Sequence, residues 1–217
     1  MQMAGKVCIV TGSNSGIGKE TAFALAEMGA TVIMVIRSQE KGKVALDEIV
    51  SKTGNNSVSL MTCDMSSMAS VRDFAAEFKK KYDRLDVLVN NAGAEYVKRQ
   101  VTSEGFEKTF AVDYLAPFLL TYELLDLLKA SAPSRIVNVS SGLAKNGKVN
   151  FDDLQNENNY KGMQAYSNAK LMLMMFTYEL SRKLEGTGVT VNVLMPGFVA
   201  TNLGKNSGSL RSALDGP

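Results

Sequence analysis

The chain has 217 residues, of which 45% are hydrophobic, so it is long enough to bury a substantial core within one domain. Its formal net charge is only +2, and charges of both signs are mixed along the sequence, which leaves no basic stripe for a nucleic acid. The chain contains no histidine. This excludes a Ser-His-Asp or Cys-His triad and any histidine-ligated metal, and we expect no metal site.

The cysteines and the first residues bear on the cellular compartment. Cys8 and Cys63 both fall in expected buried strands, which favours small core residues in a reducing compartment over a disulfide. The first strand follows directly on the first six residues, which leaves no room for a signal peptide, and no apolar run approaches the ~20 residues that span a bilayer. We therefore expect a soluble, cytoplasmic protein without a membrane span.

The first predicted element is a buried strand that ends in a glycine-rich turn, after which a helical pattern begins at once. Gly12, Gly16 and Gly18 leave no Cβ between the backbone and a large ligand, and the following helix directs free N–H groups and its positive dipole end at the turn. This arrangement suits a pyrophosphate. The spacing G-x-x-x-G-x-G differs from the commoner G-x-G-x-x-G, and an ordinary glycine-rich turn is the alternative. The residues expected to bind a dinucleotide here are Gly12, Ser13, Asn14, Ser15, Gly16, Ile17 and Gly18.

Strands and helices alternate along the rest of the chain. Short apolar strands separated by helical patterns indicate an α/β fold with a doubly wound parallel sheet (Rossmann), of order 3-2-1-4-5-6, in three α/β/α layers. We expect a single domain over 1–204 that carries both the cofactor and the catalytic site, followed by a polar tail over 205–217. The later strands are predicted at 31–36, 58–63, 85–89, 135–139 and 189–195, and the helices at 19–28, 41–52, 67–82, 106–129 and 160–185.

Residues at the ends of the second, third and fourth strands complete the expected dinucleotide site. An acidic residue after the second strand would hold the adenosine ribose of NAD, whereas Arg37 can pair bidentately with a 2′-phosphate. Arg37 and the neighbouring Ser38 therefore favour NADP(H) over NAD(H), with a solvated surface arginine as the alternative. The residues after the third and fourth strands share the same sheet edge, although Asx and Gly also commonly end strands; they are Asp64, Met65, Asn91, Ala92 and Gly93.

The fifth strand and the helix after it carry the catalytic candidates. Tyr166 and Lys170 are spaced i and i+4, so they are neighbours on one helix face. A phenol with a pKa near 10 is only about 0.1% ionised at neutral pH, and an ammonium nearby favours the phenolate; lowering that pKa to about 7 takes roughly 4 kcal/mol. The pair suits general acid/base catalysis at a carbonyl or alcohol oxygen, which Ser141 at the strand end can hydrogen-bond. A chance Tyr-x-x-x-Lys is the alternative, but its place behind a dinucleotide turn argues against chance.

These motifs resemble the short-chain dehydrogenase/reductase family over nearly the whole chain. The resemblance implies that Tyr166 is the acid/base, that Lys170 lowers its pKa and holds the nicotinamide ribose, and that Ser141 positions the substrate oxygen. The matching pieces are Thr11-Gly12-x-x-x-Gly16-Ile17-Gly18, Asn90-Asn91-Ala92-Gly93, Ser141, Tyr166-x-x-x-Lys170 and Pro196-Gly197-x-x-x-Thr201.

The resemblance also implies roles for two further segments of the chain. The long stretch between Ser141 and Tyr166 is similar to the retinol dehydrogenase-like branch, whose substrates are lipophilic alcohols and aldehydes. The segment after the last strand is expected to contact the cofactor, with Thr201 at the carboxamide. Its expected cofactor-binding residues are Pro196, Gly197, Val199 and Thr201.

The chain departs from the family pattern at Asp113 and at its end. The family usually has an asparagine at that position, which completes a proton relay through a water to the lysine; a carboxylate accepts but cannot donate, and Asp113 is our fourth catalytic candidate. Pro117 has no N–H, so the carbonyl of Asp113 loses its helical partner, and we hypothesise that this carbonyl holds the relay water. After Thr201 only a polar tail remains, so we expect a shortened C-terminal region and an exposed edge at the last strand.

The sequence thus predicts an NADP(H)-dependent oxidoreductase that transfers hydride between nicotinamide and the carbonyl or alcohol carbon of a lipophilic small molecule, such as a retinal-like aldehyde or a ketone. The alternative is a catalytically weak or inactive dinucleotide-binding protein with a regulatory or scaffold role, and a weaker third interpretation is a scaffold without cofactor. We expect a homodimer through the two long helices, for which the methionine-rich stretch 171–176 offers either core or interface residues.

Overall fold

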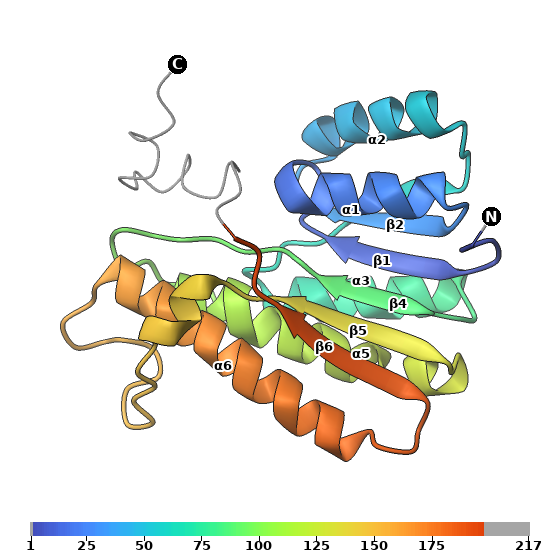
Figure 1. Ribbon diagram of the computed structural model, residues 1–217. Coiled ribbons are helices and arrows are strands. Elements are labelled where there is room, and N and C mark those ends of the chain that lie inside the picture. The colour runs from blue at the N-terminus through green and yellow to red at the C-terminus, as the bar shows by residue number, and fades with distance from the viewer. Residues whose placement is uncertain (1, 198–217) are drawn as a thin grey trace.

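The computed structural model describes residues 2–197, which form a six-stranded parallel sheet between two layers of helices (Figure 1). The strand order β3-β2-β1-β4-β5-β6 confirms the predicted doubly wound sheet. The strands are β1 (Val7–Thr11), β2 (Thr31–Ile36), β3 (Val58–Thr62), β4 (Val87–Asn90), β5 (Ser134–Val139) and β6 (Val189–Leu194). The predicted boundary at 204 and the tail over 205–217 lie outside the described residues and stay predictions.

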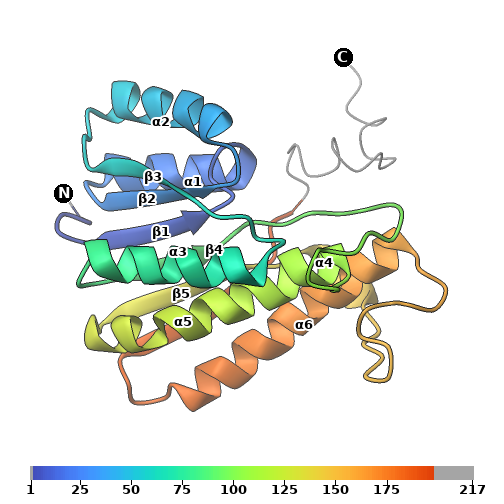
Figure 2. The same ribbon diagram turned by 180° about the vertical axis from the view of Figure 1, so that it is seen from behind.

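Helices cover both faces of the sheet, as the two opposite views show (Figures 1 and 2). Successive strand residues point to opposite faces. Accordingly Ile9 and Ile33 pack in the core under three helices, whereas Cys8 and Met34 pack in the core under the other two. The three are α3 (Met68–Lys81), α5 (Ala116–Ala130) and α6 (Gly162–Lys183), and the two are α1 (Gly16–Glu27) and α2 (Gln39–Thr53).

The single long helix predicted over 106–129 is wrong. The chain instead forms a short α4 (Lys108–Phe110), a π-helical turn η1 (Ala111–Leu115) and then α5. Pro117 lies in the first turn of α5 and has no N–H for an α-helical bond to residue 113, and the N–H of Ala116 reaches back five residues to the carbonyl of Ala111. The interruption places Asp113 in the π-helical turn.

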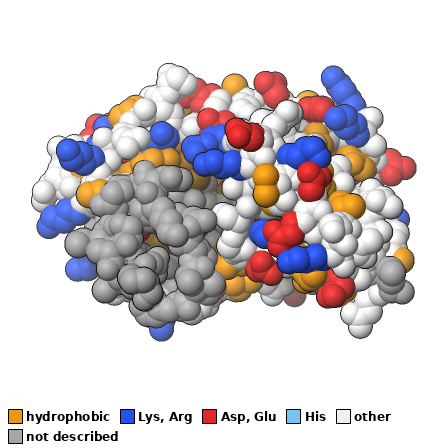
Figure 3. All heavy atoms as spheres, turned by 90° about the horizontal axis from the view of Figure 1, so that it is seen from above, with side chains coloured by type: hydrophobic (Ala, Val, Ile, Leu, Met, Phe, Trp, Pro, Cys, Tyr) orange, Lys and Arg blue, Asp and Glu red, His pale blue; other side chains and the backbone are white. Residues whose placement is uncertain are grey.

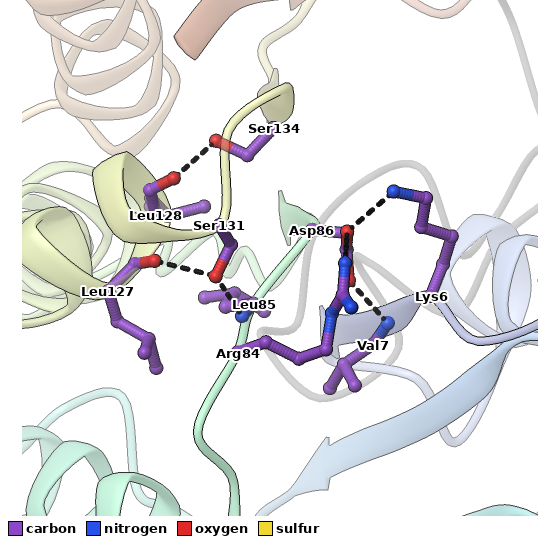
Figure 4. A network of polar contacts seen from close by, with 9 residues as sticks. All are labelled: Lys6, Val7, Arg84, Leu85, Asp86, Leu127, Leu128, Ser131 and Ser134. Carbon is purple, nitrogen blue, oxygen red and sulfur yellow. Dashed lines mark hydrogen bonds and ion pairs between the residues drawn. The ribbon is translucent and has the colours of Figure 1, made fainter. Parts of the chain in front are cut away.

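Internal polar bonds join the strand starts at the amino edge of the sheet (Figure 4). Asp86, just before β4, pairs with Lys6 at 2.9 Å and with Arg84 at 2.7 Å. The hydroxyl of Ser131 accepts the backbone N–H of Leu85 at 2.9 Å. The polar groups that the sequence assigns to a ligand lie at the opposite, carboxyl edge.

The surface carries mixed charge. Seen from above, acidic and basic side chains lie interspersed on the part of this face that the described residues form (Figure 3). Among residues 2–197, no helix has the length and apolar character needed to cross a bilayer. In the same range, no three or more cysteine, aspartate and glutamate side chains gather in a way that would hold a metal ion.

Candidate active site

The glycine-rich turn between β1 and α1 packs against the loop that follows β4. Gly12 has a φ of +66°, and a Cβ on it would lie 2.9 Å from Cα of Ala92, so glycine alone permits this approach. A Cβ on Gly18 would collide with the side-chain amide of Asn91 and with the carbonyl of Gly12. Both glycines are therefore required by the packing of the turn, in addition to any room they leave for a ligand.

The same turn holds unsatisfied polar groups that fit a nicotinamide dinucleotide. Ser13 is fully buried, and among the described residues its Oγ has no hydrogen-bond partner. Ser15 precedes α1 without capping it through its side chain, and no acidic residue lies in the first helical turn. Free N–H groups, the positive end of the helix dipole and an orphaned hydroxyl are suited to the phosphates and ribose of a dinucleotide. The half-buried Asn14 lies between these two serines.

The residues after β2 and β3 lie at the same edge, but two of them already have local partners. Ser38 accepts a backbone N–H as the N-cap of α2, and Asp64 accepts bonds from the residue two positions on. Met65 is buried in the core. Arg37 is exposed and lies near Tyr96: burial raises the pKa of that phenol and the charge of Arg37 partly offsets the effect. Of these four predicted residues, Arg37 is the one with an exposed charged side chain.

Thr11 is a candidate that the sequence reasoning did not single out as a site residue. Its Oγ1 accepts the backbone N–H groups of Asn91 and Ala92, each at 2.9 Å, and donates to the carbonyl of Val89 at 3.4 Å. The side-chain amide of Asn91 donates in turn to the carbonyl of Thr11 at 2.8 Å. Thr11 therefore holds the loop after β4 against the glycine-rich turn. The available signal was a hydroxyl residue at the end of an otherwise apolar, fully buried strand.

Tyr166 and Lys170 are both buried on α6, each about 3% exposed, with Lys170 Nζ 5.7 Å from the centre of the Tyr166 ring. Lys170 Nζ donates to the carbonyl of Val139 at 3.1 Å, and the hydroxyl of Ser140 donates to the carbonyl of Lys170 at 3.0 Å. These two bonds join the end of β5 to α6. Ser141, the next residue in the chain, therefore lies at the junction that carries the tyrosine and the lysine.

Ser141 begins a 3-10 helix, η2 (Gly142–Asn146), which sequence patterns did not reveal. Its Oγ accepts the N–H of Leu143 at 3.2 Å, which leaves the hydroxyl hydrogen to donate. The end of η2 lies directly on α6, because a Cβ on Gly147 would lie 2.8 Å from the carbonyl of Ser167. This contact holds the half-buried Ser141 beside α6, which carries Tyr166 and Lys170.

Asp113 is fully buried and contacts Lys170 directly. Its Oδ2 lies 3.5 Å from Lys170 Nζ, and its Oδ1 accepts the backbone N–H of Ala94 at 2.7 Å. Burial raises the pKa of Asp113 to about 6, and the charge of Lys170 and the Ala94 bond act in the opposite direction. Gly93 leaves room for this pair, since a Cβ there would lie 3.2 Å from Nζ. The predicted relay water at the Asp113 carbonyl stays a prediction, and the observed contact is made by the side chain.

The segment between η2 and α6 packs on the loop after β4. The hydroxyl of Tyr160 donates to the carbonyl of Tyr96 at 2.8 Å, and the N–H of Glu107 donates to the side-chain oxygen of Gln155 at 3.0 Å. Two chain segments that flank the β5–α6 junction are thus joined to each other.

The segment after β6 is described only in part. Pro196 is half-buried and Gly197 exposed at the carboxyl edge, while Val199 and Thr201 lie outside the described residues. The structure therefore gathers the glycine-rich turn, the loop 91–93, Asp113 and the Ser-Tyr-Lys set at one edge of the sheet.

The family model for short chain dehydrogenases matches residues 6–211 of the chain. Retinol dehydrogenase 13 of Homo sapiens is 46% identical over 205 residues, which cover 94% of this chain and 62% of that protein. Retinol dehydrogenase 11 of Homo sapiens is 45% identical over 211 residues, covering 97% of this chain and 66% of that protein. The predicted likeness to retinol dehydrogenases is confirmed, and the chain spans less than two thirds of the length of these curated relatives.

Solved structures with a similar fold include two complexes with NADP. The Pseudomonas aeruginosa RhlG/NADP active-site complex has a TM-score of 0.77 and 28% identity, covering 94% of this chain and 77% of that one. A metagenomic short-chain oxidoreductase in complex with NADP has a TM-score of 0.76 and 27% identity, covering 91% of this chain and 85% of that one. The fold described above is therefore that of the dinucleotide-binding structures it resembles.

Proposed function

This chain belongs to the short-chain dehydrogenase family, and on that premise we propose that it is an NADP(H)-dependent oxidoreductase that interconverts a carbonyl group and an alcohol. The observation that carries the proposal is the buried Lys170, which is bonded to the end of β5 and lies 5.7 Å from the Tyr166 ring centre. A buried ammonium beside a phenol favours proton exchange at the phenol, because it stabilises the phenolate. When bound, the nicotinamide supplies or accepts the hydride.

The residues at the β5–α6 junction divide the remaining work. Tyr166 gives a proton to the carbonyl oxygen during reduction and takes it from the alcohol during oxidation. Lys170 stabilises the phenolate, and Ser141 donates its free hydroxyl hydrogen to the same oxygen and so orients it. Asp113 acts on Tyr166 indirectly, through Lys170, which it contacts at 3.5 Å.

The test is the Tyr166→Phe variant, with Tyr178→Phe on the same helix as the matched control because Tyr178 is 62% exposed. We expect Tyr166→Phe to lower the rate of aldehyde and ketone reduction at least 100-fold, since general acid catalysis contributes 10²–10⁴-fold, while cofactor binding is retained. Tyr178→Phe should leave the rate unchanged. Cofactor binding without turnover in the unmodified chain would instead support the dinucleotide-binding protein with a regulatory or scaffold role.

We propose that the cofactor is held by the turn over 12–18, the loop 91–93 and residues 196, 197, 199 and 201, and that Arg37 selects NADP(H). Support comes from the exposed Arg37 at the end of β2 and from the NADP named with two similar structures. Calorimetry should show tighter binding of NADPH than of NADH, and Arg37→Glu should weaken NADPH by roughly 10–100-fold, as expected for loss of a charged hydrogen-bonded pair. Arg72→Glu, on the exposed side of α3, is the control; equal effects of both variants would contradict the role of Arg37.

We propose a lipophilic substrate, a retinal-like aldehyde or a ketone. The proposal rests on the identity to retinol dehydrogenases and on the segment after η2, which packs on the loop after β4 beside the catalytic junction. A series of straight-chain aldehydes tests it: kcat/KM should rise with chain length, by about 0.8 kcal/mol for each buried CH₂. A kcat/KM that does not change with the chain length of the aldehyde would instead indicate a polar substrate.

We propose a homodimer through α5 and α6. Large side chains on these helices are unusually exposed, including Phe118 at 41%, Tyr122 at 69% and Met175 at 44%, and exposed apolar patches mark interaction sites. Light scattering should give twice the chain mass, and Tyr122→Lys with Phe118→Lys should give a monomer. A monomer in the unmodified chain would contradict the proposal. We also propose a reducing compartment such as the cytoplasm, because Cys8 and Cys63 are both buried thiols.

A further inference from the structure

The carboxylate of Asp113 and the ammonium of Lys170 form a buried pair at the centre of the site. Asp113 is fully buried, the side chain of Lys170 is 4% exposed, and Oδ2 and Nζ are 3.5 Å apart. The pair is held from both sides: Oδ1 accepts the N–H of Ala94, and Nζ donates to the carbonyl of Val139. Its geometry is therefore set by the loop after β4 and by the end of β5.

Other titratable groups near the pair do not replace either partner. Glu107, which caps α4 with both carboxylate oxygens, acts on Asp113 as a like charge. Tyr96, on the loop after β4, feels the charge of Asp113. Tyr166 also neighbours Lys170, with its ring centre 5.7 Å from Nζ. Lys170 is the cation that opposes Asp113, and Tyr166 is the phenol that shares this cation.

The charge count of this cluster decides how readily Tyr166 ionises. With Asp113 ionised and Lys170 protonated, the neutral phenol leaves the buried cluster at zero net charge, and the phenolate brings it to minus one. With an uncharged residue at position 113, the count goes from plus one to zero instead. An uncompensated buried charge is costly, so the carboxylate opposes ionisation of Tyr166.

We infer that Asp113 is a positioning residue that acts through Lys170 to raise the pH at which Tyr166 loses its proton, and that it thereby extends proton donation by Tyr166 into the alkaline range. The inference rests on the proposed function, in which Tyr166 exchanges the proton with substrate. Burial raises the pKa of Asp113 to about 6, so the carboxylate is ionised, and the effect present, above that pH.

Titration of Tyr166 tests the inference without turnover. The near-ultraviolet absorbance of tyrosinate is followed against pH in the folded chain, and the titration of the matching Tyr166→Phe background is subtracted. We expect Asp113→Asn and Asp113→Ser, both of which remove the charge, to lower the midpoint of Tyr166 by about one pH unit or more. Asp86→Asn, a buried carboxylate at the opposite edge of the sheet, is the matched control and should leave the midpoint unchanged.

The pH profile of turnover is the second readout. In Asp113→Asn, the alkaline limb of carbonyl reduction and the rise of alcohol oxidation should both move to lower pH by the same amount as the midpoint. An unchanged midpoint in both position-113 variants overturns the inference, and so does a higher one, which would mean that the carboxylate chiefly keeps Lys170 protonated. If the midpoint falls but Tyr166→Phe leaves turnover intact, the inference about ionisation stands and the proposed function fails. If Tyr166→Phe abolishes turnover but the midpoint does not shift, the proposed function stands and the inference fails.

Discussion

Asp86 offers the sharpest test of what stabilises the fold, because two cations and one amide converge on a carboxylate that is only 2% exposed. Lys6 Nζ donates to it at 2.9 Å, Arg84 donates through Nε at 2.9 Å and through Nη2 at 2.7 Å, and the N–H of Val7 donates at 2.9 Å (Figure 4). The contacts link the residue before β1 to the start of β4, which lies next to β1 in the sheet.

The magnitude follows from the pKa. Burial raises the pKa of Asp86, but the bonds from Arg84, Lys6 and Val7 outweigh burial and hold it at about 2. A depression of about two units below the ordinary value corresponds to roughly 2–3 kcal/mol of folding free energy. Because the pKa is lower in the folded state, this stabilisation is complete above about pH 5 and is lost as the pH falls towards 2.

Asp86→Asn should therefore reduce the free energy of unfolding by roughly 2–3 kcal/mol at pH 7, which lowers Tm by about 4–12 °C for a chain of this size. Urea unfolding at pH 7 and pH 3 measures the loss, and about half of the difference from the unmodified chain should be gone at pH 3. Asp47→Asn removes an exposed pair with Lys43 at 2.7 Å and should cost less than about 0.5 kcal/mol. A loss in Asp86→Asn that matches Asp47→Asn, or that is the same at both pH values, would refute this reasoning.

Three further predictions concern the turn and the core. Gly12→Ala should weaken dinucleotide binding, measured by calorimetry, and should cost about 1–3 kcal/mol of stability in urea unfolding, because the new Cβ would lie 2.9 Å from the backbone of Ala92. Gly54→Ala is the control and should cost less, because Gly54 also has a positive φ but faces open space. Thr11→Val leaves the N–H of Ala92 without its acceptor, while the N–H of Asn91 keeps the carbonyl of Val89 at 3.1 Å, and should cost about 1–3 kcal/mol in urea unfolding, with Thr11→Ser restoring most of the loss. Burial raises the pKa of Cys8 to about 12 and of Cys63 to about 11, so both thiols should react far more slowly with an alkylating reagent at pH 8 than in urea, as mass spectrometry would show; equal rates would contradict their burial.

The sequence predicted the sheet well because its signals are local and repeated. Each short apolar run becomes a strand, and right-handed crossovers leave few orders open for six parallel strands. The error over 106–129 has a single cause: helical periodicity continues through residue 113, while the missing N–H of Pro117 lengthens one turn without altering the pattern of apolar residues. A hydrophobic pattern therefore predicts where such a helix lies, but not how its hydrogen bonds are registered.

The candidate site could be predicted in outline because parallel strands end at one edge. The sequence did not distinguish ligand-binding residues from caps, since Ser38 and Asp64 belong to residue types that serve both purposes. The family resemblance linked position 113 to the lysine only through a water, whereas the direct contact between the Asp113 side chain and Lys170 depends on how η1 turns the carboxylate towards a helix that begins much later in the chain.

The two edges of the sheet differ in how they satisfy buried polar groups, and this difference argues for a ligand at one of them. At the amino edge, the buried Asp86 accepts hydrogen bonds from Lys6, Val7 and Arg84. At the carboxyl edge lie Ser13 Oγ, Asn90 Oδ1, Glu95 Oε2 and Asp113 Oδ2, which among the described residues are the buried side-chain atoms without a hydrogen bond. Asp113 Oδ2 still has the ion pair with Lys170, but each of the other three atoms costs about 1–3 kcal/mol, so leaving them at the ends of β1 and β4 is a sizeable loss of stability. Unsatisfied buried polar atoms are expected where a bound ligand can form hydrogen bonds with them. The glycine-rich turn and the Tyr166–Lys170 pair lie at this same edge of the sheet.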